Sequence, residues 1–580
     1  MREEIIAVLR PILGDGTPIE LSVPDVDLFG HYATNWALRA AKTRGVVPFE
    51  LAKEYAAKIT AAAPEGFFHK VEAAPPGFIN FWLSNRTIQE RFAWITHDRK
   101  FGESAVGKGK TVIVEYSQPN IAKKMHVGHM RTTIIGDALA NIFEMSGWRV
   151  IRWNYLGDWG TQFGKLIAAY KMWGDRETVE KDPIVELQKL YVRFHEEVKM
   201  DPALEGRGRE EFRKLEEGDR ENRNLWDWFK SESLSEFRKM YQALDIDFDI
   251  WIGESFFERD MKPTVKLLVD SGIAATSADG GVVVKFDDVD LPPALVEKSD
   301  GASLYLTRDI ASLRYRLRKY KPARILYVVG NEQSLHFEQL FAIARKLGLT
   351  DGVELVHIKY GLVLGERGKK LSTREGTAEM LDDLVDEAIV KAREVVETKN
   401  PDLPESEKTE VAFAVAMGAL KYNDLKENRT TDIVFNWEKM LDFTGDSGPY
   451  LQYTYARLRS IIRKSNASPL VSRATAGESF AKLTSDGAAM LEQTAELALM
   501  RKLFEFPEAV HRAGELYATS QLAVYLYQLA VTANKFYEVT PILKDDDAAR
   551  RRARLALVAV VAGVLQKGLG LLGIKTLEKI

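Results

Sequence analysis

Residues 112 to 137 read VIVEYSQPNIAKKMHVGHMRTTIIGD, and they contain the change of pattern around which the chain is organised. The run from Thr111 to Tyr116 is short and β-branched and is followed by Pro119, which is typical of a buried strand that ends at a turn. From Val127 onward the apolar residues recur at helical spacing. The sequence therefore predicts a strand that passes into a helix, with His126 and His129 at the junction.

A helix that begins at this junction would attract phosphate, because its first N–H groups are free and its dipole is positive there. Gly128 has no Cβ, so a flat ring or a phosphate can approach the backbone closely. Imidazoles three residues apart can share one face of a turn and donate to oxygens that gain charge when pyrophosphate leaves. This pattern favours a nucleoside triphosphate site. The alternative is that His126 and His129 only cap the helix or pack against it.

The same segment resembles the HIGH signature of class I aminoacyl-tRNA synthetases, and the run EYSQPNIAKKMHVGHMRTT is similar to arginyl-tRNA synthetases in particular. The resemblance implies an α/β fold, in which a Rossmann-like catalytic domain with a parallel sheet is joined to an N-terminal α+β domain and a C-terminal all-α anticodon-binding bundle. It also implies ATP-dependent ligation of L-arginine to its tRNA. The reaction would pass through an arginyl-adenylate and release AMP and diphosphate.

The resemblance extends over nearly the whole chain and divides it into four regions. We expect an N-terminal tRNA-binding domain, a catalytic domain that contains a helical insertion, a helical connecting region and an anticodon-binding domain. The expected boundaries are 1–105, 106–377 with the insertion at 171–244, 378–445 and 446–580.

Apolar patterns predict the elements of the first two domains. In the first domain we expect helices at Tyr32–Lys42 and Pro48–Ala62 and strands at Phe67–Val71 and Gly77–Leu83. The second half of the parallel sheet is expected at Val282–Phe286, Ser303–Leu306, Ile325–Val329 and Val353–Ile358. Ligands of such sheets bind beyond the carboxyl ends of the strands, where the strand order switches.

Composition sets broad limits on the chain. With 580 residues it is too long for a single core, and 46% hydrophobic and 28% charged residues are ordinary for a globular protein. A net charge of −4 means that any RNA-binding surface must be a local basic patch. Without cysteines or an HExxH helix, the sequence contains no recognisable metal site. The N-terminus differs from a presequence and the longest apolar run, Leu555 to Leu565, is too short for a bilayer, so we expect a cytoplasmic protein without membrane contact. We separately expect a monomer.

Two further segments are expected at the ATP site. GNEQSLH, Gly330 to His336, resembles a class I pattern, although a capped helix after a strand is an alternative. GERGKKLSTREGT, Gly365 to Thr377, is a cationic loop that resembles the KMSKS signature, although a solvated surface loop is the alternative. Thr373 stands where that signature has its second lysine, and Lys123 is the expected replacement. The resemblance assigns ATP with Mg²⁺ to His126, Gly128, His129, His336, Lys370 and Ser372, and catalysis to His126, His129, Lys123 and Lys370.

A pocket for arginine must offer carboxylates and neutral acceptors to a planar guanidinium. Glu115, at the end of the first strand, and Asp309 are the acids placed to supply this charge, with Tyr305 alongside. These positions match the arginine-binding positions of the family that the chain resembles. By the same resemblance, Asn120 and Gln333 would hold the α-amino and carboxylate groups of the substrate.

Contacts with tRNA are expected at both ends of the chain. By resemblance, Phe78 and Asn80 would stack on and hydrogen-bond to an unpaired base, although Phe78 in an ordinary strand would pack inward. Tyr450, Tyr453 and Arg457 belong to a segment in which aromatic and basic residues alternate, which suits single-stranded RNA. The alternative is that these tyrosines pack inside a helical bundle.

Three other classes of protein compete with this interpretation. A small nucleotidyltransferase with an HxGH motif would share the ATP site but would lack the long helical C-terminal region. A non-catalytic tRNA-binding relative would be expected to have lost the HVGH or KLSTR motif or Asp309. A Rossmann dehydrogenase would need a GxGxxG turn where Gln118, Pro119 and Asn120 stand.

Overall fold

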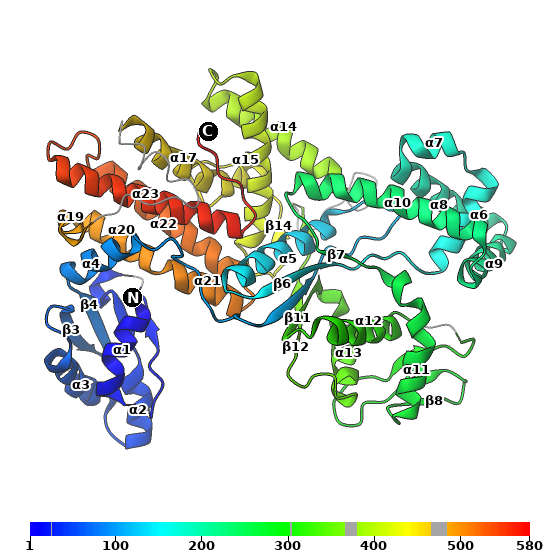
Figure 1. Cartoon of the computed structure of the whole chain (residues 1–580), viewed down its shortest axis with the longest axis horizontal. Coiled ribbons are helices and arrows are strands. Elements are labelled where there is room, and N and C mark those ends of the chain that lie inside the picture. The colour runs from blue at the N-terminus through cyan, green and yellow to red at the C-terminus, as the bar shows by residue number, and fades with distance from the viewer. Residues whose placement is uncertain (15, 25, 302–303, 366–379, 466–483) are drawn as a thin grey trace.

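The computed structural model describes residues 1–580 except 15, 25, 302–303, 366–379 and 466–483. An α/β unit lies at the centre of the molecule, with a group of helices projecting on one side (Figure 1). On the other side a bundle of C-terminal helices lies against the N-terminal α+β unit (Figure 1).

The central sheet has five strands in the order β12-β11-β5-β6-β7, and every neighbouring pair is parallel. This confirms the predicted parallel sheet. The first strand in sequence, β5, lies in the middle, and helix α5 connects it to β6. The chain then adds β7 on one side and β11 and β12 on the other, so the order switches between β5 and β11, where ligands of such sheets bind. The strands and this helix are β5 (Thr111–Glu115), α5 (Val127–Met145), β6 (Arg149–Asn154), β7 (Ile250–Trp251), β11 (Arg324–Gly330) and β12 (Glu354–Tyr360).

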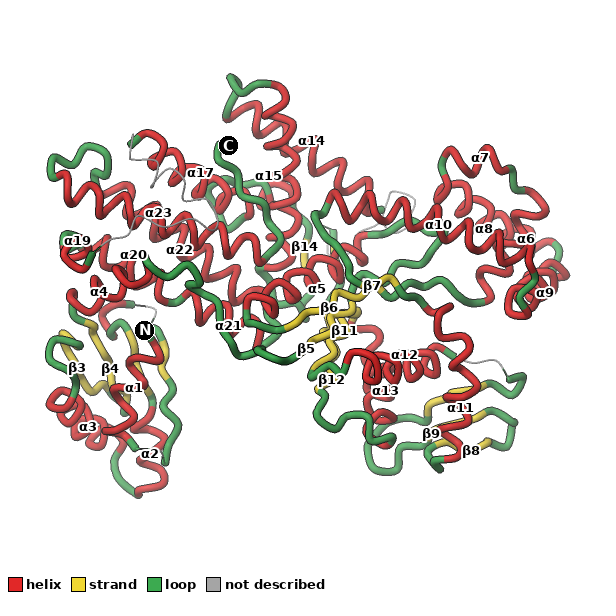
Figure 2. The backbone as a smooth tube through the Cα atoms, viewed as in Figure 1, coloured by secondary structure: helices red, strands yellow, loops and turns green. Residues whose placement is uncertain are grey.

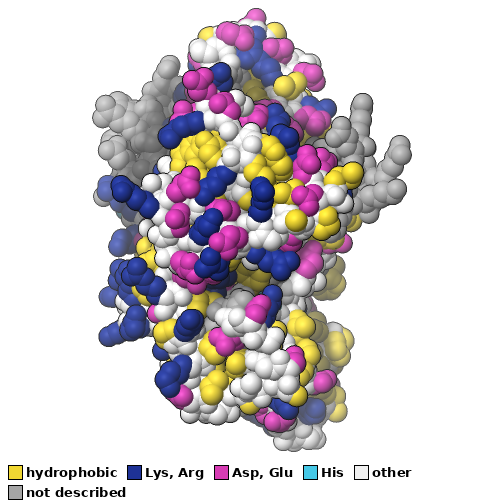
Figure 3. All heavy atoms as spheres, turned by 90° about the vertical axis from the view of Figure 1, so that its right-hand side faces the viewer, with side chains coloured by type: hydrophobic (Ala, Val, Ile, Leu, Met, Phe, Trp, Pro, Cys, Tyr) yellow, Lys and Arg dark blue, Asp and Glu magenta, His cyan; other side chains and the backbone are white. Residues whose placement is uncertain are grey.

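The segment between β6 and β7 is helical, as predicted. Trp226 and Phe229 are buried there, and the Trp226 indole N–H donates to the Asp158 carbonyl at 2.8 Å, which anchors the insertion to the sheet. Acidic and basic side chains are interspersed over the centre of the outer face of the molecule on this side (Figure 3), as expected for a solvated surface. The helices are α6 (Thr161–Trp173), α7 (Arg176–Lys181), α8 (Pro183–Met200), α9 (Ala203–Glu217) and α10 (Arg220–Ala243).

Two predicted strands of the parallel sheet are wrong. Val282–Val284 forms the middle strand of a separate antiparallel sheet, in which it pairs with the strands that precede and follow it in sequence. In the second segment, position 303 is outside the described residues, and Tyr305 and Leu306 begin a helix whose apolar residues Leu306, Ile310 and Leu313 recur at helical spacing. The elements here are η2 (Glu254–Asp260), α11 (Met261–Asp270), β8 (Ala274–Thr276), β9 (Val282–Val284), β10 (Ala294–Glu297), α12 (Tyr305–Tyr320), η3 (Asn331–Gln333) and α13 (Ser334–Lys346).

The N-terminal unit is an antiparallel sheet of order β1-β2-β4-β3 packed with helices, which agrees with the predicted α+β class. The helix predicted from Tyr32 begins only at Trp36, because Tyr32–Thr34 pairs with Ile79–Phe81 as a strand. Its elements are α1 (Arg2–Leu13), β1 (Leu21–Ser22), η1 (Asp27–Phe29), β2 (Tyr32–Thr34), α2 (Trp36–Arg44), α3 (Pro48–Ala62), β3 (Phe68–Ala74), β4 (Phe78–Leu83) and α4 (Asn85–Ile95).

The C-terminal half is almost entirely helical, as Figure 2 shows, apart from a two-stranded parallel link between β13 and β14. It contacts the N-terminal unit directly, since the Gln89 side-chain amide on α4 donates to the carbonyls of Ala489 and Leu491. The elements are β13 (Val363–Leu364), α14 (Leu381–Lys399), α15 (Glu405–Leu425), β14 (Ile433–Val434), α16 (Trp437–Met440), α17 (Gly448–Lys464), α19 (Ser485–Ala489), α20 (Thr494–Phe504), α21 (Phe506–Glu515), α22 (Thr519–Val539) and α23 (Ala548–Leu571).

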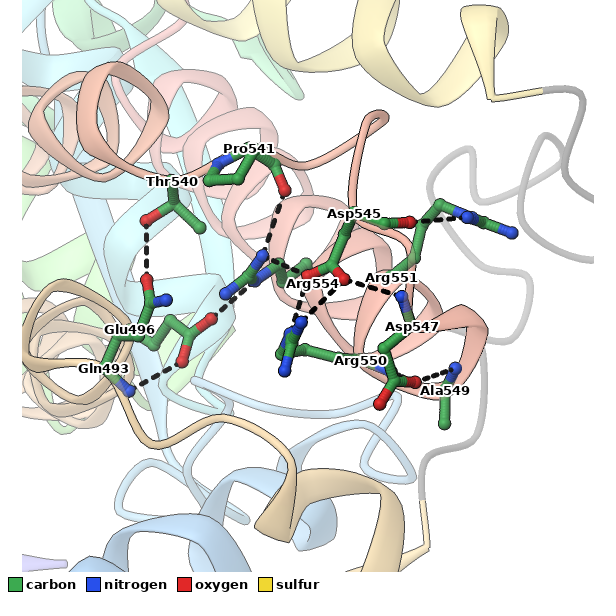
Figure 4. Close-up of polar contacts among 10 residues, drawn as sticks. All are labelled: Gln493, Glu496, Thr540, Pro541, Asp545, Asp547, Ala549, Arg550, Arg551 and Arg554. Atoms are coloured by element: carbon green, nitrogen blue, oxygen red, sulfur yellow. Dashed lines mark hydrogen bonds and ion pairs between the residues drawn. The ribbon is translucent and has the colours of Figure 1, made fainter.

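Helix α23 contains the longest apolar run of the chain. The run alone is too short to cross a bilayer, whereas the whole helix has 24 residues and is long and apolar enough to do so. It is instead a core helix, because 78% of its most apolar window is buried by the surrounding protein. Its buried Arg554 is paired with Glu496 of α20 and with Asp545 (Figure 4). A paired buried cation of this kind fits the interior of a helical bundle.

Candidate active site

A cleft of about 810 Å³ opens at the carboxyl ends of β5 and β11, at the switch in strand order. It collects residues that the sequence analysis proposed for two different substrates. Nine of them line it, namely Glu115, Asn120, His126, Gly128, His129, Tyr305, Asp309, Gln333 and His336. Glu115 and Asp309, the two acids proposed for arginine, therefore share one cleft with the paired imidazoles.

The turn between β5 and α5 is strained, which is common where a backbone shapes a binding site. Ser117, Gln118 and Ala122 all have left-handed φ angles, of 77°, 50° and 59°. The turn is held by helix α5, because the Ser117 N–H donates to the Thr132 hydroxyl at 3.1 Å and the Thr133 hydroxyl bonds to the Ser117 hydroxyl at 2.8 Å. The same helix that follows the turn thus fixes its shape.

The imidazoles of His126 and His129 lie against each other, with ring centroids 3.9 Å apart. The Gly128 N–H donates to His126 Nδ1 at 3.1 Å, and the His126 N–H donates to His129 Nδ1 at 3.0 Å. Since Nδ1 accepts in both rings, the proton of each neutral ring lies on Nε2. The two histidines do cap the helix, as the alternative interpretation held, but capping uses only Nδ1 and leaves two Nε2–H donors.

Burial keeps these donors uncharged. It lowers the pKa of His126, and burial together with the adjacent His126 lowers the pKa of His129 to about 3. A neutral imidazole in a fixed tautomer can donate to a developing phosphate charge without first gaining or losing a proton.

Two glycines allow close approaches inside the cleft. A Cβ on Gly128 would lie 2.9 Å from the His126 ring, so this glycine leaves space for the protein's own imidazole, whereas the sequence predicted the approach of a ligand ring or a phosphate. A Cβ on Gly157 would lie 2.1 Å from Asn120 Oδ1. Gly157 therefore provides the space in which the Asn120 side chain lies.

Glu115 is buried at the base of the cleft. Its Oε2 forms an ion pair with Arg316 of α12, and its Oε1 accepts a hydrogen bond of 2.8 Å from the Gln118 side-chain amide. Burial raises the pKa of Glu115, and the charge of Arg316 opposes this shift. Arg316 could not be predicted from the sequence, because its position on α12 resembles that of any other inward residue of the helix.

Asp309 and His336 form the second polar pair of the cleft, with His336 Nε2 and Asp309 Oδ2 2.6 Å apart. Burial alone would lower the pKa of His336, but the hydrogen bond and charge of Asp309 outweigh it and raise that pKa. Tyr155 also lines this cleft, and its buried hydroxyl has no hydrogen-bond partner among the described residues.

Glu254 is a third acid of the cleft that the sequence analysis missed. Burial raises its pKa to about 8 against the opposing charge of Arg308, and Asp309 and Asp158 add to the increase. Its place just after β7, at the carboxyl end of a strand of the parallel sheet, is the signal that could have revealed it. That signal was lost because Ile250–Trp251 is too short for its pattern to indicate a strand.

Three family models match consecutive parts of the chain. They are described as the N-terminal domain of arginyl tRNA synthetase (residues 1–83), the catalytic domain of tRNA synthetases class I (R) (92–437) and the DALR anticodon binding domain (451–580). The chain belongs to the arginyl-tRNA synthetase family. An arginine–tRNA ligase of Streptococcus pneumoniae is 41% identical over 94% of this chain and 92% of its own length. An arginine–tRNA ligase of Halothermothrix orenii is 40% identical over 94% of this chain and 93% of its own length.

Solved structures of the same family agree with this assignment. The arginyl-tRNA synthetase of Plasmodium falciparum is 26% identical, with a TM-score of 0.83 over 100% of this chain and 99% of its own. That of Thermus thermophilus is also 26% identical, with a TM-score of 0.79 over 100% of both chains. The predicted family and the predicted fold class are therefore both confirmed.

The lysines that the family resemblance assigned to catalysis are not part of the described cleft. Lys123 lies next to it in sequence, but its Nζ is 5.2 Å from the ring centroid of Tyr191 on α8 and the residue does not line the cleft. Lys370, Ser372 and Thr373 lie outside the described residues. The proposed replacement of a loop lysine by Lys123 stays a prediction.

The residues proposed for tRNA lie in two separate places. Phe78 and Asn80 lie on β4 of the N-terminal domain, where Phe78 is half-buried and Asn80 is buried. At the other place, Tyr450, Tyr453 and Arg457 of α17 are half-buried and converge on Asn534 of α22. Arg457 donates to Asn534 Oδ1 at 3.0 Å and to the Tyr453 hydroxyl at 3.1 Å, and Asn534 donates to the Tyr450 hydroxyl at 2.9 Å.

Proposed function

We propose that the cleft between β5 and β11 is the site at which this chain activates L-arginine. As a member of the arginyl-tRNA synthetase family, the chain is an arginine–tRNA ligase: it uses ATP to charge tRNA with arginine through an aminoacyl-adenylate. The single observation that supports the site is that Glu115 and Asp309 lie in one cleft with the paired imidazoles of His126 and His129.

In the first step the arginine carboxylate attacks the α-phosphorus of ATP, and the bond to the bridging oxygen of the β-phosphate breaks. The guanidinium would be bound by Glu115 and Asp309, with Tyr305 alongside, because a planar cation pairs best with fixed carboxylates. Asn120 and Gln333 would hold the α-amino and carboxylate groups. No covalent bond to the protein is needed, so catalysis depends on positioning and on charge stabilisation.

ATP would bind along the start of α5, and we propose that it enters as its Mg²⁺ complex. The Nε2–H groups of His126 and His129 would donate to phosphate oxygens as negative charge moves onto the departing pyrophosphate. Gly128 would contribute to the ATP site by leaving room for the His126 ring beside the nucleotide, and His336 would stand at the opposite wall of the cleft. From the resemblance alone, we also propose that Lys123, Lys370 and Ser372 contact the phosphates of ATP.

In the second step the terminal ribose hydroxyl of tRNA attacks the arginyl carbonyl, and AMP leaves. We propose that Tyr450, Tyr453 and Arg457 contact the anticodon region, because half-buried aromatic rings beside a guanidinium suit stacking and phosphate contact. Phe78 and Asn80 would contact an unpaired base elsewhere on the tRNA. The burial of Asn80 means that this contact needs the backbone of β4 or a local rearrangement. We further propose a monomeric cytoplasmic enzyme with domains at 1–105, 106–377, 378–445 and 446–580.

The proposal is tested by charging total tRNA with each of the twenty amino acids, with and without ATP. Arginine alone should be attached, and only when ATP is present. Asp309→Asn should raise the KM for arginine about 10- to 100-fold, since it removes the charge from one ionic hydrogen bond. The KM for ATP should change little. An unchanged arginine KM would remove Asp309 from the arginine site, and attachment of another amino acid would overturn the proposed specificity.

A further inference from the structure

A second arginine side chain lies directly behind the proposed arginine site, and it belongs to the protein itself. Arg316 of α12 is 1% exposed, and one of its Nη atoms pairs with Glu115 Oε2. Its guanidinium carbon lies 4.4 Å from the ring centroid of Trp153, and the rings of Tyr155 and Tyr327 follow at 5.5 Å and 5.6 Å. Arg316 does not line the cleft, so it can influence a ligand only through Glu115 or these rings.

The burial of Arg316 is costly. Its Nε and Nη1 atoms have no hydrogen-bond partner among the residues that the structure describes. Unpaired buried donors lower stability, and an ion pair in a protein interior is often no better for stability than apolar residues of similar volume. The contacts with aromatic rings offset part of this cost. Filling the space behind the cleft is therefore a poor explanation for a guanidinium at this position.

The effect of Arg316 on Glu115 is more specific. Both carboxylate oxygens of Glu115 are engaged, one by Arg316 and the other by the Gln118 amide, so the carboxylate is held in one orientation. Burial raises the pKa of Glu115 and so favours the protonated form, whereas the charge of Arg316 lowers it. The negative charge of Asp309 acts in the same direction as burial.

We propose that Arg316 is a positioning residue that keeps Glu115 oriented and ionised for the guanidinium of the substrate. This inference rests on the proposed function of the cleft. It has a consequence for the charge of the pocket, because Arg316 and Glu115 cancel each other. Asp309, which also bonds to His336, then carries the negative charge that faces the substrate cation, while the lone pairs of Glu115 stay available as fixed acceptors.

The first test is Arg316→Met, which keeps the volume and removes the charge. The KM for arginine in pyrophosphate exchange should rise about 10- to 100-fold, the size of effect expected for one ionic hydrogen bond. The KM for ATP should stay within about twofold, which corresponds to less than the loss of one neutral hydrogen bond. Arg318→Met is the matched control, because Arg318 lies on the same helix and is exposed. Equal arginine KM values in the two variants would overturn the inference.

The pH profile separates positioning from a purely structural role. Without Arg316 the pKa of Glu115 should move further up, so the rise in arginine KM on acidification should begin at higher pH than in the wild type. Asp309, Glu254 and His336 also face this cleft, and they are present in both proteins. Arg316→Lys should return the profile to that of the wild type, because it restores the cation. If the arginine KM of Arg316→Met depended on pH in the same way as that of the wild type, the inference would be contradicted.

Glu115→Gln distinguishes failure of this inference from failure of the proposed site. If Glu115→Gln leaves the arginine KM unchanged, the assignment of Glu115 is wrong and the proposed function of the cleft fails with it. If Glu115→Gln raises the KM and Arg316→Met does not, only the inference fails. Should Arg316→Met not fold, the double variant Glu115→Gln/Arg316→Gln replaces it. Its arginine KM should equal that of Glu115→Gln, and a further increase would show that Arg316 acts by another route.

Discussion

The Nδ1 atom of His129 accepts a hydrogen bond of 3.0 Å from the backbone N–H of His126, the residue whose own Nδ1 caps the same helix. The two rings therefore fix each other's tautomer, and both present Nε2–H to the cleft. The Nδ1 atoms of the two side chains accept hydrogen bonds at the start of the helix, and their Nε2–H groups are left to donate to phosphate.

His129→Ala should reduce turnover about 100- to 1000-fold, the usual cost of removing one donor to a developing oxyanion. The KM for arginine should change little, because the acids that bind the guanidinium are untouched. Pyrophosphate exchange at saturating ATP measures both quantities. His511→Ala is the control, since His511 lies on the exposed side of α21. Wild-type turnover in His129→Ala would show that His129 does not contact the reacting phosphates.

Gly157→Ala should displace the Asn120 side chain, because the new Cβ would lie 2.1 Å from its Oδ1. If Asn120 binds the substrate, the arginine KM should rise about 10-fold, the cost of one misplaced hydrogen bond. The stability of the protein should change less than this affinity, since Asn120 can turn toward the open cleft. Gly206→Ala provides the comparison, because a Cβ on Gly206 meets no atom within 4 Å and alanine suits the helix there. Equal arginine KM values for both variants would argue against Asn120 as a ligand.

Arg131 joins the catalytic helix to the C-terminal half of the chain, and its removal should be strongly destabilising. Its side chain is fully buried, pairs with Asp424 of α15 at 3.0 Å and donates to the Gly361 carbonyl at 2.8 Å. Arg131→Met leaves Asp424 buried without its partner, which typically costs about 3–5 kcal/mol.

The double variant Arg131→Met/Asp424→Leu should recover much of that loss, because no unpaired charge remains in the interior. Urea unfolding of the wild type, the two single variants and the double variant measures the coupling. Additive effects of the two substitutions would show that the ion pair is not the origin of the loss.

Glu254 should make stability depend on pH. Its carboxyl ionises near pH 4.5 in the unfolded chain, whereas burial raises its pKa to about 8 in the folded protein. The folded state therefore binds an extra proton in this interval, so the stability due to Glu254 is fully present below about pH 4.5 and is lost as the pH rises through about 8.

Glu254→Gln removes this dependence. Its Tm should exceed that of the wild type at pH 8 by roughly 2–4 °C, the shift expected for about 1 kcal/mol in a domain of this size. At pH 5 the two Tm values should be much closer. Thermal unfolding at both pH values measures the difference. The same Tm difference at pH 5 and pH 8 would mean that Glu254 does not titrate in this range.

Local patterns were sufficient to predict the centre of this molecule. The β-branched run before Pro119 and the helical spacing after Val127 are both properties of a few neighbouring residues, and they located β5, α5 and the histidines between them. Pro48–Ala62 was predicted to the residue for the same reason, since a proline fixes its start and alanines fill it.

The errors arose where pairing partners decide the structure. Val282–Val284 has the composition of any buried strand, and only its antiparallel neighbours place it outside the main sheet. Tyr32–Thr34 is a strand because β4 lies beside it, although its own pattern continues into a helix. Arg316 and Glu254 were missed because their importance depends on side chains more than 50 residues away, which no local pattern contains.

The contact between Gln89 and the carbonyls of Ala489 and Leu491 joins residues 400 and 402 positions apart. A ribosome adds about 5–20 residues per second, so roughly 20 to 80 s pass between the synthesis of the two sides of this interface. During that time the surface of α4 that later packs against α19 and α20 is exposed to other molecules in the cell. We therefore expect the N-terminal unit either to fold by itself or to be shielded by a chaperone until the last third of the chain has been made.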